Sequence, residues 1–230
     1  MGKLRVAVVG SGIAGLAAVT FALLVMCQTA SAQPKLPDAA KGWTYVGNSQ
    51  CKICHNNPKE GAQWDTWKKS KHAQALDLLK TDAAKEVAKK AGITEAPDAS
   101  PKCLKCHVTG YDEAKAAAPD KIVMADSVQC ESCHGPASEH VKDGKALKLA
   151  PAKIAETDIK AHITVPNEAM CVGCHNNSAP SWKDDRYTVD GKKVGFDFKQ
   201  AWEKIKHEWP DGYIDAKYQG KFPKNEPLTK

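Results

Sequence analysis

Apolar residues in the middle and late parts of the chain recur with the helical period. Residues 63–80 carry an apolar face that includes His72; the other residues of this face are Trp64, Ala75, Leu76 and Leu79. Residues 196–209 carry a second apolar stripe, formed by Phe198, Trp202, Ile205 and Trp209. We therefore expect a mainly helical chain with long loops and little or no sheet.

The start of the chain has a different pattern. Residues 6–26 form an apolar run without a charge, after a short basic start and before TASAQ, a cleavage signal that ends at Ala32. The run also contains the spacing GxGxxG, but no polar helix face and no acidic residue about 20 positions later accompany it, which disfavours a dinucleotide site. We read residues 1–32 as a secretory signal peptide, and disfavour an uncleaved anchor or a lipoprotein at Cys27.

Export would leave one mature domain. Residues 33–46 are expected to form a flexible leader, and residues 47–230 a single domain with an irregular C-terminal tail rich in glycine and proline. No second apolar stretch of membrane length follows the first. The mature part would therefore have no membrane span.

Eight of the nine cysteines fall into four CxxC pairs, and a histidine directly follows each pair. This is the attachment motif of haem c, in which two thiols form thioethers to the porphyrin and the next imidazole ligates the iron. Zinc sites or redox dithiols would not need a histidine at this position in all four pairs. We predict four covalent haems c that fill much of the interior. The attachment cysteines are Cys51, Cys54, Cys103, Cys106, Cys130, Cys133, Cys171 and Cys174, and the proximal ligands are His55, His107, His134 and His175.

Each iron usually takes a second axial ligand, and histidine is the best candidate here. The mature chain has only Met124 and Met170, and Met170 abuts Cys171, where it is poorly placed to reach the far side of its own haem. Low-potential haems with two histidines are therefore expected. The four remaining histidines are His72, His140, His162 and His207.

These four histidines differ in their surroundings. His72 lies on the apolar helix face, and His140 shares a predicted face with Ala137 and Leu147, so both favour ligation over a buried core role. His207 projects away from its helix stripe, and His162 lies in an extended or loop stretch. For His162, ligand and bystander remain equal alternatives.

The motifs resemble the tetrahaem cytochrome c five-five-four family, electron carriers of ammonia-oxidising bacteria. The resemblance covers residues 47–207 and rests on CKICH with WKKSKHAQAL, CLKCHVTGY, SVQCESCHGP, CVGCH and FDFKQAWEKIKH. It implies that His140 completes the first haem (His55), His72 the third (His134) and His207 the fourth (His175). It also implies an open distal side at the second haem (His107).

Two features depart from the family pattern. The loop before His140 is shorter, and His162 is available as an additional histidine. The second haem is therefore either open or ligated by His162.

Three functions remain open at this stage. The leading hypothesis is a periplasmic or extracellular tetrahaem carrier that passes single electrons between redox protein donors and acceptors. The second is a reductase of nitric oxide or a similar small molecule at an open second haem. The third is a subunit of an extracellular conducting filament or another homo-oligomer.

The charge pattern excludes one class of partner. The formal net charge is +6 for the whole chain and +4 without the signal peptide, and lysines are spread along the sequence rather than grouped with aromatic residues. This pattern is typical of a solvated basic surface and does not support nucleic-acid binding.

Overall fold

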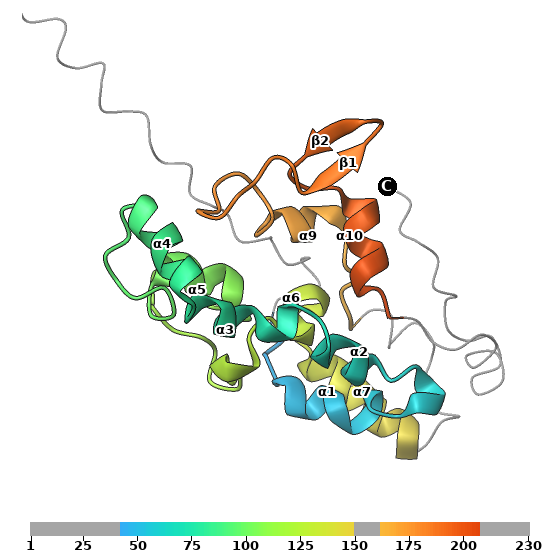
Figure 1. The fold of residues 1–230 in the computed structure, drawn as a ribbon. Coiled ribbons are helices and arrows are strands. Elements are labelled where there is room, and N and C mark those ends of the chain that lie inside the picture. Colours follow the sequence, from blue (N-terminus) through green and yellow to red (C-terminus); the bar gives the residue numbers. More distant parts are fainter. Residues whose placement is uncertain (1–41, 150–161, 208–230) are drawn as a thin grey trace, which may run out of the picture. The chain divides into compact units, whose positions relative to one another are not determined.

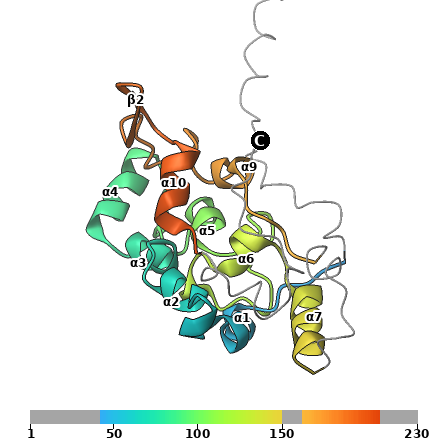
Figure 2. The same cartoon turned by 90° about the vertical axis from the view of Figure 1, so that its right-hand side faces the viewer.

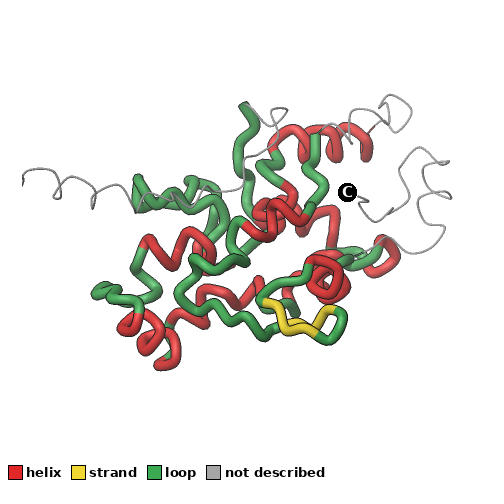
Figure 3. The backbone as a smooth tube through the Cα atoms, turned by 90° about the horizontal axis from the view of Figure 1, so that it is seen from above, coloured by secondary structure: helices red, strands yellow, loops and turns green. Residues whose placement is uncertain are grey.

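The computed structural model of the protein describes residues 42–149 and 162–207, which belong to one compact unit. The predicted signal peptide, most of the predicted leader and the C-terminal tail lie outside these residues. The described part is mainly helical, as expected, with short helices joined by long loops and a small pair of strands (Figure 3).

The elements follow one another along the chain as labelled in Figure 1. The first half contains α1 (Asn48–His55), η2 (Pro58–Glu60), α2 (Gln63–Lys68), η3 (His72–Gln74), α3 (Ala75–Leu79), α4 (Asp82–Lys90) and α5 (Pro101–His107). The second half contains η4 (Met124–Asp126), α6 (Cys130–His134), α7 (Ser138–Leu149), α9 (Glu168–Val172), β1 (Tyr187–Val189), β2 (Lys192–Val194) and α10 (Phe198–Ile205). The elements labelled η are single turns of 3-10 helix.

The helix predicted over residues 63–80 is divided into α2, η3 and α3. Hydrogen bonds to a distant part of the chain replace helical ones at this point. The Leu76 N–H donates to Oγ of Ser127 at 3.0 Å, and the Val128 N–H donates to the His72 carbonyl at 3.2 Å. Because these tertiary bonds compensate for the broken helix, His72 is carried on a bend that lies against the segment before α6.

The apolar core of the described residues is small. It lies between α3, α5 and the loop that follows α5, and consists of Leu76, Leu79, Leu104, Val108, Tyr111 and Ile122. The largest fully buried side chains are polar: Gln129, Asn48, Thr109, Ser100 and Ser127. Since a domain normally buries mostly apolar side chains, this interior is in keeping with a bound group that supplies part of the apolar volume.

Glu131 is one of the two inner residues of the third CxxCH motif and is only 2% exposed. Its carboxylate accepts hydrogen bonds from the N–H groups of Gly47 at 2.8 Å, Ala137 at 2.8 Å and Val46 at 3.0 Å. Burial raises the pKa of the Glu131 carboxyl, and these three donors act in the opposite direction. The side chain fastens α6 to the segment before α1 and to the start of α7.

The segment around α1 brings together parts of the chain that are far apart in sequence. α1 lies beside α2, α6 and α7, and Figures 1 and 2 show this neighbourhood from two sides. Two backbone contacts fix the start of α7: the Thr44 N–H donates to Oγ of Ser138 at 3.0 Å, and the Ser138 N–H donates to the Thr44 carbonyl at 3.1 Å.

The strands β1 and β2 form an antiparallel hairpin that the hydrophobic periodicity did not predict. Tyr187 pairs with Val194, and the two-residue connection is Asp190-Gly191 with φ of 49° and 76°. A positive φ at both positions is typical of the tight turn that Asp-Gly favours. The sequence signal was therefore present in the dipeptide rather than in the periodicity.

Candidate functional site

The first three CxxCH motifs lie on helices α1, α5 and α6, each of which ends at the motif histidine. On a helix, positions i, i+3 and i+4 lie on the same side, so the two cysteines and the histidine can reach one planar group together. The fourth motif begins at the end of α9, where the His175 N–H donates to the Cys171 carbonyl at 2.9 Å. None of the eight motif cysteines forms a disulfide with a described residue.

The thiols of different motifs meet in pairs. The side chains of Cys51 and Cys130 lie next to each other, which brings the first and third motifs together. The side chains of Cys106 and Cys174 also lie next to each other, which brings the second and fourth motifs together. The four motifs, which are separated in the sequence, thus lie beside one another in two pairs.

Three motif histidines each face a histidine from another part of the chain. The ring centres of His55 and His140 are 6.2 Å apart. Those of His72 and His175 are 6.0 Å apart, and those of His134 and His207 are 5.7 Å apart. The structure therefore brings together three of the four predicted distal candidates with three of the four proximal histidines.

Two of these pairs differ from those that the resemblance implied. His72 lies against His175 of the fourth motif rather than His134 of the third, and His207 lies against His134 rather than His175. The ring contacts in the structure therefore differ from the implied assignment of these two ligands. The His72 side chain lies at the bend of η3, where the His72 carbonyl accepts a hydrogen bond from the Val128 N–H.

The spacing of the pairs suits an iron ion between two imidazoles. With metal–nitrogen bonds of about 2 Å on both sides and about 1 Å from each nitrogen to its ring centre, the two ring centres would be about 6 Å apart. The observed separations lie close to this value. The Nδ1 atom of His140 is also buried without a hydrogen bond to any described residue, which is costly for a polar atom unless another partner occupies the space. These residues fit haem iron.

Hydrogen bonds to backbone carbonyls orient two of the motif imidazoles. The Nδ1–H of His107 donates to the Ala75 carbonyl at 2.6 Å, and the Nδ1–H of His134 donates to the Thr164 carbonyl at 3.1 Å. Because a carbonyl can only accept, the proton is held on Nδ1 and the lone pair remains on Nε2. This is the usual arrangement of a histidine that ligates a metal.

Burial favours the uncharged form of several of the paired imidazoles. Desolvation, with smaller contributions from neighbouring histidines, lowers the pKa of His134, His140 and His175 to about 4. Burial also lowers the pKa of His72. At neutral pH these rings are neutral, which is the form that can bind a metal ion.

Aromatic rings support the fourth motif. The ring of Phe196 is stacked on that of His175, with centres 5.4 Å apart and planes at 15°. The edge of Tyr187, on β1, meets Phe196 at 6.1 Å. The hairpin thus packs indirectly against His175 and limits the orientations of its ring.

His107 is the one motif histidine without a second imidazole opposite it within the described residues. Its Nδ1–H donates to the Ala75 carbonyl, and none of the three imidazole pairs among the described residues includes it. His162 does not fill this position. It lies instead against Asp143 of α7 and the edge of Trp43, with ring centres of Trp43 and His162 5.5 Å apart.

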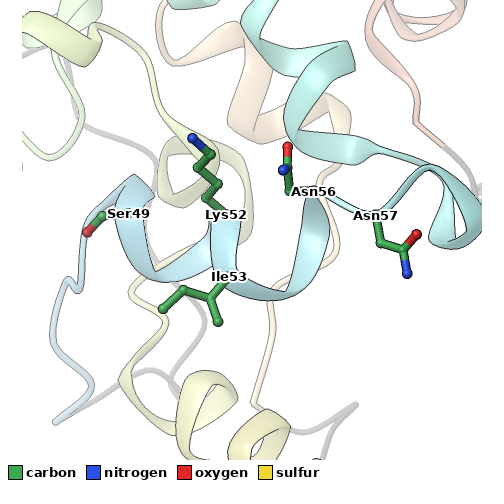
Figure 4. Close-up of a pocket in the computed structure, with 5 residues that line it drawn as sticks. All are labelled: Ser49, Lys52, Ile53, Asn56 and Asn57. Atoms are coloured by element: carbon green, nitrogen blue, oxygen red, sulfur yellow. The ribbon is translucent and has the colours of Figure 1, made fainter.

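The first motif is the most exposed of the four. Both of its inner residues, Lys52 and Ile53, are exposed, and Ile53 is 62% exposed. In the second and third motifs the first inner residue, Leu104 or Glu131, is buried. Figure 4 shows the shallow pocket on this outer face of α1, lined by Ser49, Lys52, Ile53, Asn56 and Asn57. The outer face of α1, which carries the first motif, is thus exposed to solvent.

Comparison with known proteins gives a consistent result. The family profile described as "Cytochrome c554 and c-prime" matches residues 50–135. The curated "Cytochrome c-554" of Nitrosomonas europaea is 30% identical over 198 residues, which cover 77% of this chain and 82% of that protein. A solved structure of the reduced state of cytochrome c554 from the same organism matches with a TM-score of 0.48 and 25% identity, covering 72% of this chain and 86% of that chain.

The described residues give no transmembrane helix. Within residues 42–149 and 162–207, no helix is both long enough and apolar enough to cross a bilayer.

Proposed function

We propose that the chain carries four haems c, three of them with two histidine ligands. The premise is that the chain belongs to the cytochrome c554 family and is therefore a multihaem electron carrier with covalent haem c and redox partners. The observation that supports the proposal most directly is the set of three imidazole pairs with ring centres 5.7 to 6.2 Å apart. In this proposal the axial ligands are His55 with His140, His175 with His72, and His134 with His207. We also propose that residues 1–32 direct the chain to the periplasm or beyond.

The residues of the chain have a defined part in this function. When bound, haem c supplies exchange of one electron between ferric and ferrous iron. The cysteines would hold the groups covalently, and the paired imidazoles would hold three of the irons from both sides and keep small molecules away from them. The contacts Cys51–Cys130 and Cys106–Cys174 support close neighbours within each pair of motifs, which suits rapid electron passage.

Redox titration of the purified protein tests the carrier. We expect a pyridine haemochrome assay to give four haems c per chain, and at least three of them to titrate at low potential, because two imidazole ligands and no methionine favour the ferric state. Titration waves at high potential alone would contradict the double-histidine ligation. A colourless protein with free thiols would contradict the whole proposal.

A second function is favoured by one observation, the position of His107. Because its distal side faces none of the described histidines, the haem it holds would keep an open coordination site for a diatomic molecule. We expect one nitric oxide or carbon monoxide to bind per chain, with a ferric high-spin signal of one haem in the electron paramagnetic resonance spectrum. Absence of both signals would leave the carrier function alone.

A further inference from the structure

His162 contacts Asp143 and Trp43 and belongs to none of the three imidazole pairs. Its Nδ1–H donates to Oδ2 of Asp143 at 2.5 Å, and its ring stands at 86° to that of Trp43. The side chains of His162 and Asp143 are 32% and 17% exposed, so the contact is largely shielded from water. A hydrogen bond to a carboxylate in such surroundings is stronger than one between neutral groups.

Asp143 connects this contact to the first haem site. It lies on α7 three residues after His140, so the two side chains project from neighbouring turns of the same helix side. Asp143 and His162 both lie close enough to His140 to act on it electrostatically. The start of α7 is fixed by Ser138 and Thr44, but those bonds lie before His140. Among the described residues, the Asp143–His162 contact joins the turn after His140 to another segment.

The segment that carries His162 is itself anchored at the third motif. The Thr164 N–H donates to the His134 carbonyl at 3.0 Å, and the Nδ1–H of His134 donates back to the Thr164 carbonyl. Residues 162–164 therefore connect a fixed point at the third motif with the turn of α7 next to His140. A segment with both ends bonded can resist movement of that turn.

We propose that His162 is a positioning residue that, through Asp143, holds α7 so that His140 stays opposite His55. This proposal rests on the proposed function, in which His140 is the distal ligand of the first haem. A distal imidazole can leave its iron only if its helix turn moves away. Breaking the Asp143–His162 contact makes that movement easier and opens the first haem to external ligands.

The test uses the complete haem-loaded protein and carbon monoxide as the probe. We compare the wild type with His162→Phe, Asp143→Leu and Asp143→Asn. We expect carbon monoxide to bind to the first haem about ten- to a hundredfold more readily in His162→Phe and Asp143→Leu, which corresponds to loss of one hydrogen bond to a charged group. Asp143→Asn, which can still accept the hydrogen bond but lacks the charge, should give an intermediate value.

Two controls assign the effect. Glu139→Gln removes the exposed ion pair with Lys142 on the same helix, and it should bind carbon monoxide as the wild type does. His140→Ala opens the first haem directly, so adding His162→Phe to it should give no further binding. If His162→Phe adds another binding site in that background, His162 ligates a different iron and the proposal is overturned.

Unchanged carbon monoxide binding in His162→Phe would also overturn the proposal. If His162→Phe fails to retain its haems, the Asp143→Asn variant provides the test. Carbon monoxide binding by Asp143→Asn equal to that of the wild type would exclude a positioning role. The haem count and electron transfer of the wild type, measured on the same preparation, test the proposed function separately. The two can therefore fail independently.

Discussion

His72→Ala is expected to convert one low-spin haem into a high-spin haem that binds carbon monoxide, and to raise its potential by about 100 mV or more, since axial ligands are the strongest determinant of haem potential. The affected haem should be the one attached at the fourth motif. The reason is the 6.0 Å separation between the rings of His72 and His175, with no other described histidine facing His175. Electron paramagnetic resonance and redox titration measure both changes.

The matched variant is His207→Ala, which should produce the same change at the third motif, opposite His134. A protein in which Cys171 and Cys174 are replaced by serine lacks the fourth haem and distinguishes the two sites. In that background, His72→Ala should add no high-spin signal, while His207→Ala should still add one. The opposite result would restore the pairing implied by the family resemblance.

Glu131→Leu is expected to lower the free energy of unfolding by about 3 kcal/mol or more, because it leaves the buried N–H groups of Val46, Gly47 and Ala137 without their acceptor. A loss of this size is a large part of the stability of a typical domain. Denaturant unfolding of the haem-loaded protein at neutral pH, followed by circular dichroism, measures it.

Glu131→Gln separates the shape of the side chain from its ability to accept. The amide oxygen can keep the bonds at Oε1, but its NH₂ group would face the Gly47 N–H, where the carboxylate accepts at 2.8 Å. We expect the free energy of unfolding of Glu131→Gln to lie between that of the wild type and that of Glu131→Leu. Glu113→Gln, which affects only the partly exposed contact with Lys105, is the control and should change stability by less than about 1 kcal/mol. Equal stability of all these variants would show that the Glu131 contacts contribute little.

The sequence predicted the attachment chemistry better than the pairing of ligands. Each CxxCH motif is local, and in the first three motifs the spacing alone arranges two thiols and an imidazole on one helix side. The position of His72 depends instead on contacts between distant segments, among them the hydrogen bonds from Leu76 to Ser127 and from Val128 to His72, which no periodicity reveals. The sequence therefore identified His72 as a candidate ligand without indicating its iron.

Other features were missed for comparable reasons. Glu131 occupies an inner motif position, where residue identity varies freely among the four motifs, and only its burial shows that it joins three segments. For His162 the sequence could not distinguish an iron ligand from a residue without such a role, because His162 lies in a loop where periodicity gives no information. Its contact with Asp143 depends on how residues 162–164 return to α7. The Asp190-Gly191 hairpin, by contrast, could have been predicted from its turn residues.

The hairpin offers a practical means of immobilisation. Its tip at Asp190-Gly191 is exposed, and loop tips of this kind tolerate inserted peptides well. Because β1 packs through Phe196 onto His175, a surface-binding tag inserted at the tip would tether the protein to an electrode close to the fourth motif. Voltammetry on such a film would address that redox centre first and would measure how fast charge spreads from it through the molecule.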